Sequence, residues 1–165
     1  GRDCRPGDVL IGLSSSGLHS NGFSLARKVL RSQELKGETG RALLKPTRIY
    51  VKAVRGVLKH VRVKAMAHIT GGGFTDNIPR VLPPNVGAVI QRGSWTVPRI
   101  FRTIQERGKI EDPEMFRTFN MGIGMVAICN PDEGDLLESH LDRIGQPHYR
   151  FGEIVAGDGG VHYAG

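Results

Sequence analysis

A glycine- and serine-rich segment near the start of the chain restricts its fold more than any other stretch. Residues 9–13 (VLIGL) are an apolar run with the length of a buried strand. Residues 14–22 (SSSGLHSNG) break this run, and residues 23–30 (FSLARKVL) have the pattern of a helix. A strand, a loop of glycines and hydroxyl groups, and a helix together direct backbone N–H groups towards an anion. The segment is therefore either a phosphate-binding loop or a plain glycine-rich turn.

A second segment of the same kind follows a strand expected at residues 64–70. Three glycines at 71–73 come next, and residues 74–82 predict a short helix. His68, near the end of the strand, is either bonded to the backbone or a proton carrier beside a bound anion. Asp76 either stabilises the first turn of the helix or orients a substrate amine.

Composition limits the class of protein. At 165 residues, of which 39% are hydrophobic, the chain is long enough for one domain with its own core. No apolar run approaches the roughly 18 residues of a membrane helix, and no secretory signal is visible. Cys4 and Cys129 lack the spacing of a metal site, which indicates free thiols. The first residue is Gly and not Met, so the start was processed or cloned, or the chain is part of a longer protein.

Part of the net charge of +7 lies along a helix predicted to begin at Pro46 and Thr47, with Thr47 as its N-cap. The spacing puts basic residues on one face of this helix and apolar residues on the other. A basic face is usually solvated, but it also suits an acidic partner domain or nucleic acid. Aromatic residues do not interleave with it, which gives base stacking little support. The basic row comprises Arg48, Lys52, Arg55, Lys59 and Arg62, and the apolar face comprises Ile49, Ala53, Val54, Val57, Leu58 and Val61.

The rest of the chain alternates strands and helices, apart from a polar surface excursion at residues 32–44. We expect an α+β fold, a layered α/β sandwich with a mixed β-sheet, helices packed on it and both glycine loops at one edge. A GxGxxA match at residues 122–127 is not a dinucleotide site, because its glycines open a strand instead of following one. The predicted strands are 86–91, 123–129 and 149–156, the helices are 96–107, 112–119 and 130–144, and a strand at 161–164 is expected to close a hairpin with 149–156.

Four motifs carry a resemblance to a known family. They are GDVLIGLSSSGLHSNGFSLARKVL from Gly7, LLKPTRIYVKAV from Leu43, MAHITGGGFTDNIPRVLP from Met66 and FNMGIGMV from Phe119. Over about residues 6–153 the chain resembles the C-terminal half of the phosphoribosylformylglycinamidine cyclo-ligases. The resemblance implies the C-terminal-domain fold of the aminoimidazole ribonucleotide synthetase superfamily. It also implies that residues 1–165 are a single domain, without the N-terminal domain that binds ATP and magnesium and forms the dimer.

The resemblance implies an ATP-dependent ligase reaction of purine biosynthesis. The formyl oxygen of formylglycinamidine ribonucleotide is activated by phosphoryl transfer, the amidine nitrogen attacks that carbon, and phosphate leaves as aminoimidazole ribonucleotide forms. ATP and Mg²⁺ are the implied cofactors of the full enzyme, and neither is expected to bind tightly to this chain, which is expected to be inactive alone. The implied partners are the substrate, the N-terminal domain and a second copy in a homodimer, without nucleic acid or membrane, in the cytoplasm.

The same resemblance implies roles for individual residues. His19, His68 and Asp76 are expected at the reacting groups, and no residue is expected to bind metal. The residues expected to hold the substrate phosphate are Ser15, Ser16, Gly17, Ser20, Asn21 and Gly22, and those expected to face the nucleotide are Thr70, Gly71, Gly72, Gly73 and Asn120.

Two alternatives remain open from the sequence. Formylglycinamidine ribonucleotide synthetase, selenophosphate synthetase and a hydrogenase-maturation protein share the two-domain plan, although the loop motifs fit the cyclo-ligases better. A non-enzymatic module that binds RNA or an acidic partner through the basic row is the second alternative. A steep loss of binding with added salt would distinguish contacts to a phosphate backbone from a small phosphate held in a loop.

Overall fold

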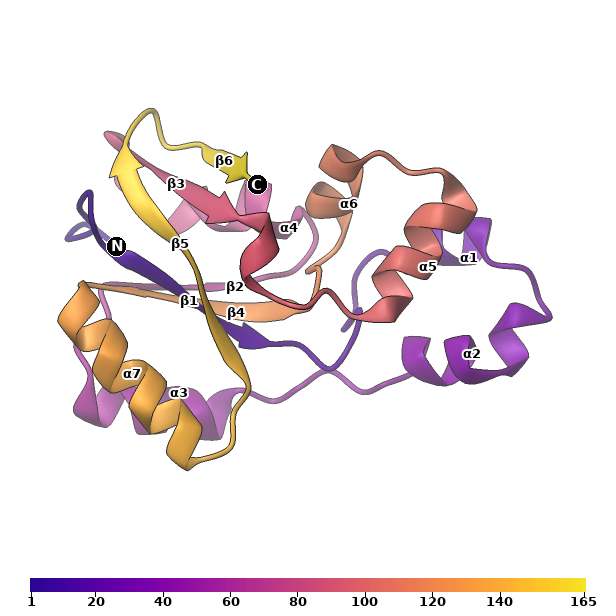
Figure 1. Ribbon diagram of the computed structural model, residues 1–165, viewed down its shortest axis with the longest axis horizontal. Coiled ribbons are helices and arrows are strands. Elements are labelled where there is room, and N and C mark those ends of the chain that lie inside the picture. The colour runs from indigo at the N-terminus through magenta and orange to yellow at the C-terminus, as the bar shows by residue number, and fades with distance from the viewer.

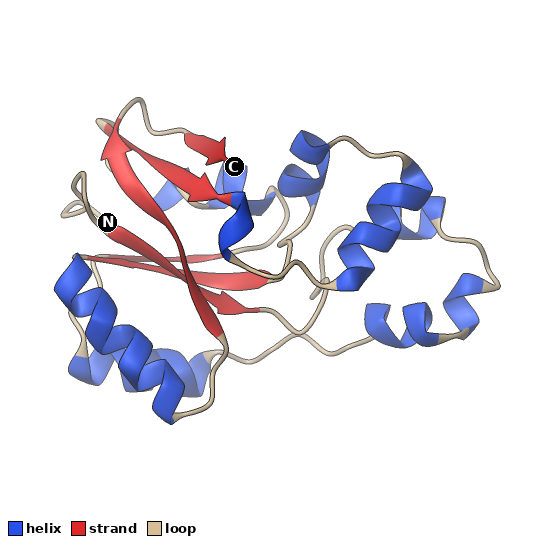
Figure 2. Cartoon of the chain, in the orientation of Figure 1, coloured by secondary structure: helices blue, strands red, loops and turns tan.

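The apolar runs of the sequence form one six-stranded sheet in the computed structural model, which describes residues 1–165 (Figures 1 and 2). The order of strands across the sheet is β2-β4-β1-β5-β3-β6. The continuously apolar β4 lies in the interior, between β2 and β1, as its composition predicts. The strands are β1 (Val9–Ser14), β2 (Ala65–His68), β3 (Val86–Gln91), β4 (Ile123–Cys129), β5 (His148–Ala156) and β6 (Val161–Ala164).

The sheet is mixed, as expected, but the predicted closing hairpin is wrong. β6 pairs parallel with β3, and the other four strand pairs are antiparallel. The reason is that β5 already pairs with β1 on one side and β3 on the other, so it has no free edge for a hairpin partner. The glycine-rich turn after β5 therefore crosses the start of β3, where Ala88 N donates to Gly160 O at 2.9 Å.

Capping residues and apolar periodicity in the sequence predict most of the helices close to their observed positions. Pro131 follows Asn130, whose side chain accepts a hydrogen bond from Glu133 N at 2.8 Å, the predicted cap of α7. None of these helices combines the length and the apolar composition that a membrane span requires. The helices are α1 (Phe23–Val29), α2 (Glu38–Leu43), α3 (Val51–His60), α4 (Gly73–Asn77), α5 (Arg99–Gly108), α6 (Asp112–Thr118) and α7 (Pro131–Arg143), with short 3₁₀ turns at Glu34–Lys36, Pro79–Val81 and Arg92–Ser94.

Helices cover both faces of the sheet and create two cores. α3 and α7 lie on one face, at the lower left of Figure 1, over a smaller core that contains Ile11 and Leu13. α1, α4, α5 and α6 supply residues to the larger core on the other face, including Phe74 and Phe101. β1 contributes Leu10 to the larger core, and its burial on both sides explains why it is apolar at successive positions.

The helix predicted from Pro46 begins only at Val51, so the expected N-cap at Thr47 is wrong. The residues before Val51 instead bond to the first glycine loop, through Pro46 O and the Arg48 N–H, and are held outside the helix. Ile49 precedes the helix and is 82% exposed, and Leu58 is 55% exposed, so neither belongs to the buried face.

The start of α5 also differs from the prediction. The helix begins at Arg99 and not at 96, because Pro98 disfavours helical geometry in the residue before it.

The predicted surface excursion at residues 32–44 has more structure than expected. It contains the turn Glu34–Lys36 and helix α2, and Leu43 is buried in the larger core. α2 packs near the first glycine loop, since a Cβ on Gly17 would lie 3.3 Å from Ala42 O.

Candidate functional site

The two glycine loops lie at the same edge of the sheet, as predicted. β1 and β2 both pair antiparallel with β4, so they run in the same direction. Their last residues, Ser14 and His68, pair with positions near the start of β4. The loops approach each other closely, because Asn21 Oδ1 lies 3.7 Å from the position that a Cβ on Gly71 would occupy.

Ser15 and Asn120 form a buried network inside the first loop (residues 15–22). Ser15 Oγ lies 2.9 Å from the Gly17 carbonyl oxygen and 3.0 Å from Asn120 Oδ1. Asn120 Nδ2 donates to the same carbonyl at 2.9 Å, and Asn120 Oδ1 accepts from Gly122 N at 2.9 Å. Both side chains are buried, so they shape the loop from within and do not face solvent.

Two hydroxyl groups join the first loop to the segment before α3. Ser16 Oγ donates to Pro46 O at 2.6 Å, and Ser20 Oγ lies 3.3 Å from Thr47 Oγ1. Ser20 is exposed and Asn21 is half-buried, so these two polar side chains are accessible at the loop surface.

Gly22 ends the loop in a conformation that requires glycine. Its φ is 76°, in the left-handed region. A Cβ at this position would also overlap the ring of Phe119. The loop backbone therefore lies directly on the core.

His19 is buried beneath the loop, with 5% of its surface exposed. Its Nε2 accepts hydrogen bonds from Ser16 N at 3.2 Å and Arg48 N at 3.4 Å. Because Nε2 is an acceptor, the neutral ring carries its proton on Nδ1, which has no partner in the chain. Burial, with His68 and Arg48 nearby, lowers the pKa of His19 to about 4. His19 is thus a neutral link between the loop and the segment before α3.

Tyr50 lies between the two histidines. Its ring centroid is 6.0 Å from that of His19 and 6.4 Å from that of His68, and its hydroxyl donates to Ser14 O at 2.9 Å. Burial raises the pKa of Tyr50, so it stays protonated. Gly124 lies beneath this cluster, where a Cβ would overlap Tyr50 Oη and the His19 ring. His68 is the exposed member of the cluster.

The second loop is a tight turn in which two glycines adopt left-handed backbone angles. Gly72 has φ 96° and Gly73 has φ 54°. A Cβ on Gly73 would overlap Phe116 O, and a Cβ on Gly72 would lie 2.6 Å from Asp76 Oδ2. The Asp76 carboxylate therefore folds back over Gly72.

Asn77 contacts the second loop, and sequence reasoning did not single it out. It is buried, and its carboxamide bonds to Thr70, Gly71 and Gly73 around the second loop. Tyr50 was also missed. Both lie inside the motifs that carry the family resemblance, but their neighbours in the sequence give no sign of their contacts.

Both loops contain backbone N–H groups that the chain itself does not use. In the second loop these belong to Gly71, Gly72, Phe74 and Thr75. In the first loop they include Ser20, Gly22 and Phe23. Free amides at a turn of glycines are suited to bind the oxygens of a phosphate group.

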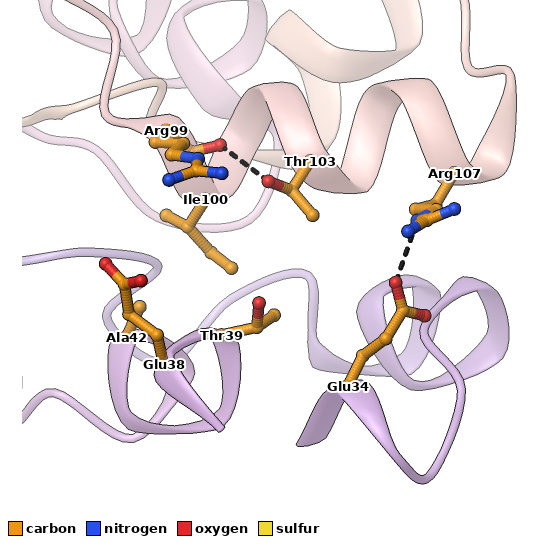
Figure 3. Close-up of a pocket in the computed structure, with 8 residues that line it drawn as sticks. All are labelled: Glu34, Glu38, Thr39, Ala42, Arg99, Ile100, Thr103 and Arg107. Carbon is orange, nitrogen blue, oxygen red and sulfur yellow. Dashed lines mark hydrogen bonds and ion pairs between the residues drawn. The ribbon is translucent and has the colours of Figure 1, made fainter. Parts of the chain in front are cut away.

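A separate polar cleft between α2 and α5 contains none of the predicted site residues (Figure 3). Arg107 Nε pairs with Glu34 Oε1 across it at 2.8 Å. Its remaining lining residues are Glu38, Thr39, Ala42, Arg99, Ile100 and Thr103. Its mixed charges, and the absence of every predicted site residue from its lining, make it a poor candidate for the site.

No group of three or more His, Cys, Asp or Glu side chains is placed to hold a metal ion. Asp76 is the carboxylate beside the glycine turn. The amides of the two loops, by contrast, fit phosphate oxygens.

Residues 5–165 match the family model described as the C-terminal domain of AIR synthase related proteins. The chain belongs to this family. The family membership confirms the resemblance stated from the four motifs, and it agrees with the mixed sheet and its helices.

Curated relatives extend well beyond this chain. It is 51% identical to a phosphoribosylformylglycinamidine cyclo-ligase of Thermoanaerobacter sp. strain X514, over 97% of this chain and 50% of the relative. It is 52% identical to the same-named protein of Caldicellulosiruptor bescii, over 98% of this chain and 50% of that relative. The chain thus spans about half the length of the curated relatives that it matches.

Solved structures share the fold at low sequence identity. The hydrogenase maturation protein HypE, in a crystal structure in complex with ATP, has a TM-score of 0.68 and 14% identity, covering 97% of this chain and 48% of that one. At this identity the likeness concerns the fold alone.

Proposed function

We propose that this chain is the substrate-side half of a phosphoribosylformylglycinamidine cyclo-ligase, the activity named for its relatives at about 50% identity. The observation that carries the proposal is the pair of glycine loops at one sheet edge, each with N–H groups that the chain does not use. A nucleotide substrate and ATP both carry phosphate groups, which are the kind of anion that such loops bind.

In this proposal the first loop holds the phosphate of formylglycinamidine ribonucleotide. The free amides of Ser20 and Gly22, with the accessible side chains of Ser20 and Asn21, face the ligand. Ser15, Ser16 and Gly17 keep the loop in shape, since their groups bond within the chain. The second loop, from Thr70 to Gly73, faces the nucleotide, and Asn120 supports the first loop from beneath.

The two histidines have different proposed roles. In this proposal His68 moves a proton from the substrate nitrogen during ring closure. Its exposure at the end of β2 supports this role. His19 uses Nε2 for two backbone N–H groups and is neutral, so in this proposal it positions the loop and segment 46–50 and transfers no proton. Asp76 orients an amine in this proposal, which the position of its carboxylate beside Gly72 supports.

Bound ATP supplies the phosphoryl group that activates the formyl oxygen of the substrate. The magnesium ligands, most ATP contacts and the homodimer interface are proposed to lie in the half of the relatives' length that this chain does not contain. The isolated chain is therefore proposed to bind substrate without turnover and to bind neither ATP nor Mg²⁺ tightly. The cytoplasm is the proposed location.

An amide NMR titration with aminoimidazole ribonucleotide, the expected product, tests the phosphate assignment. We expect shifts concentrated at residues 15–22 and around residues 68–73. Shifts confined to the cleft between α2 and α5, or no shifts at millimolar ligand, would contradict a phosphoribosyl site preformed in this half.

Substituting His68→Asn in the full-length protein tests the role of that side chain. We expect kcat to fall by roughly 10²-fold or more, the usual contribution of a proton-transfer group, with a small change in KM. His162→Asn is the matched control, because His162 is an exposed histidine on β6, at the opposite edge of the sheet from β2. Unchanged turnover in His68→Asn would remove His68 from the mechanism.

A non-enzymatic role for the basic row remains the second candidate. Lys52, Arg55 and Lys59 are exposed and have no ion-pair partner within the chain. Binding to RNA through this row should weaken steeply with added salt. The side chains of Ile49 and Val51, beside the row, are apolar and exposed. They are better suited to contact a protein partner than to contact RNA.

A further inference from the structure

Asn77 is the last residue of α4 and is only 6% exposed. A buried carboxamide must find hydrogen-bond partners, because an unpaired one is costly. Its partners lie almost entirely in the second glycine loop, four to seven residues earlier in the chain.

The nitrogen of this side chain faces three carbonyl groups of the turn. Asn77 Nδ2 lies 2.8 Å from Gly73 O, 3.1 Å from Gly71 O and 3.4 Å from Thr70 O. On its other side, Asn77 Oδ1 accepts from Thr70 Oγ1 at 3.3 Å and from Arg80 Nη1 at 3.3 Å. One side chain thus bonds to both ends of the turn.

The direction of these carbonyls determines where the amides point. In a trans peptide the C=O and the following N–H point in opposite directions. Holding the carbonyls of Thr70, Gly71 and Gly73 towards Asn77 therefore turns the N–H groups of Gly71, Gly72 and Phe74 away from it. These are N–H groups that no other part of the chain uses.

We propose that Asn77 is a positioning residue that aims the amides of the second loop at a phosphate group. This inference rests on the proposed function, which places phosphate at the loops, and adds the residue that gives the second loop its binding geometry. Asparagine is required because the site needs a donor for the carbonyls and an acceptor for Thr70 Oγ1. Aspartate can only accept, and leucine can do neither.

The test is an amide NMR titration of this chain with inorganic phosphate, comparing wild type, Asn77→Asp and Asn77→Leu. In wild type we expect shifts at both loops. In both variants the apparent affinity read at Gly71, Gly72 and Phe74 should fall by roughly tenfold or more, the change expected from one lost hydrogen bond. Shifts at residues 20–23 should be retained.

Asn85→Asp is the matched control for the added negative charge, because Asn85 is exposed and precedes β3. It should leave the response of both loops unchanged. Equal phosphate affinity at the second loop in wild type and Asn77→Asp would overturn the inference. Absence of shifts at both loops in wild type would instead overturn the proposed function on which it rests.

A measurement on the wild-type chain keeps the inference testable if the variants do not fold. The side-chain amide protons of Asn77 are expected to exchange slowly with solvent and to shift when phosphate is added. Rapid exchange, or slow exchange without any response to phosphate, would show that Asn77 does not couple to a phosphate at the turn.

Discussion

His19 shows how one side chain acquires a role through its surroundings. The ring lies beneath the first loop and accepts two backbone N–H groups from different segments through one nitrogen. It has a positive φ of 58°, a backbone conformation that most side chains avoid. A histidine in a glycine-rich loop suggests a proton carrier, yet here the geometry makes it a structural acceptor.

The low pKa of His19 predicts a dependence of stability on pH. The unfolded chain binds a proton at His19 near the usual pKa of about 6.5, while the folded chain binds it only near pH 4. The stabilisation is therefore full above pH 6.5 and is lost as the pH falls towards 4. The free energy of unfolding should decrease by about 3 kcal/mol from this group between pH 7 and pH 4.

Urea denaturation of wild type and His19→Asn at several pH values measures this effect. Asparagine tolerates a positive φ and retains an acceptor, so the variant should fold. The difference in stability between the two proteins should shrink as the pH falls from 7 to 4. A difference that stays constant over this range would show that His19 does not resist protonation in the fold.

At the scale of elements, α3 has one face that packs and one that does not. Ala53 and Val57 are buried in the smaller core, while Arg55 and Lys59 are exposed and unpaired. Exposed cations without partners contribute little to stability. The basic residues therefore lie on the solvent-exposed face of α3, and its buried face packs the helix against the smaller core.

Single alanine substitutions on the two faces of α3 should differ sharply. Arg55→Ala and Lys59→Ala should each change the free energy of unfolding by less than about 0.5 kcal/mol. Val57→Ala should cost about 1–3 kcal/mol, because it removes buried methyl groups and leaves a cavity. Chemical denaturation measures all three, and a large loss from Arg55→Ala or Lys59→Ala would indicate a packing role for the basic row.

At the scale of the whole molecule, the sheet separates two cores, and each contains one cysteine. Cys4 belongs to the larger core and Cys129 to the smaller. Both thiols are free and buried. They therefore report on the two faces of the sheet independently.

Neither thiol should react with a disulfide reagent in the native chain at pH 8. Burial raises the pKa of Cys129 to about 11 and also raises the pKa of Cys4, which disfavours the reactive thiolate. Both should react in denaturant, and Cys4→Ser and Cys129→Ser identify each signal. Rapid native reaction of one thiol would show that its side of the sheet opens without global unfolding.

The sequence by itself determined the central strands and several of the helices. The strands 86–91 and 123–129, the cap at Asn130 and the inward residues Ile100, Phe101 and Ile104 follow from periodicity and capping chemistry. These features depend on residues near one another in the chain.

Only the tertiary structure decided which groups meet. β6 pairs with β3 because β5 has no free edge, and that depends on strands over a hundred residues apart. The acceptor role of His19 depends on the backbone of Arg48, and the helix predicted from Pro46 starts late because that segment bonds to the loop. Hydrogen bonds between distant segments produce no periodic pattern in the sequence. The local pattern therefore predicts where the loops rich in glycine and hydroxyl groups lie, while the tertiary structure determines which groups each side chain contacts.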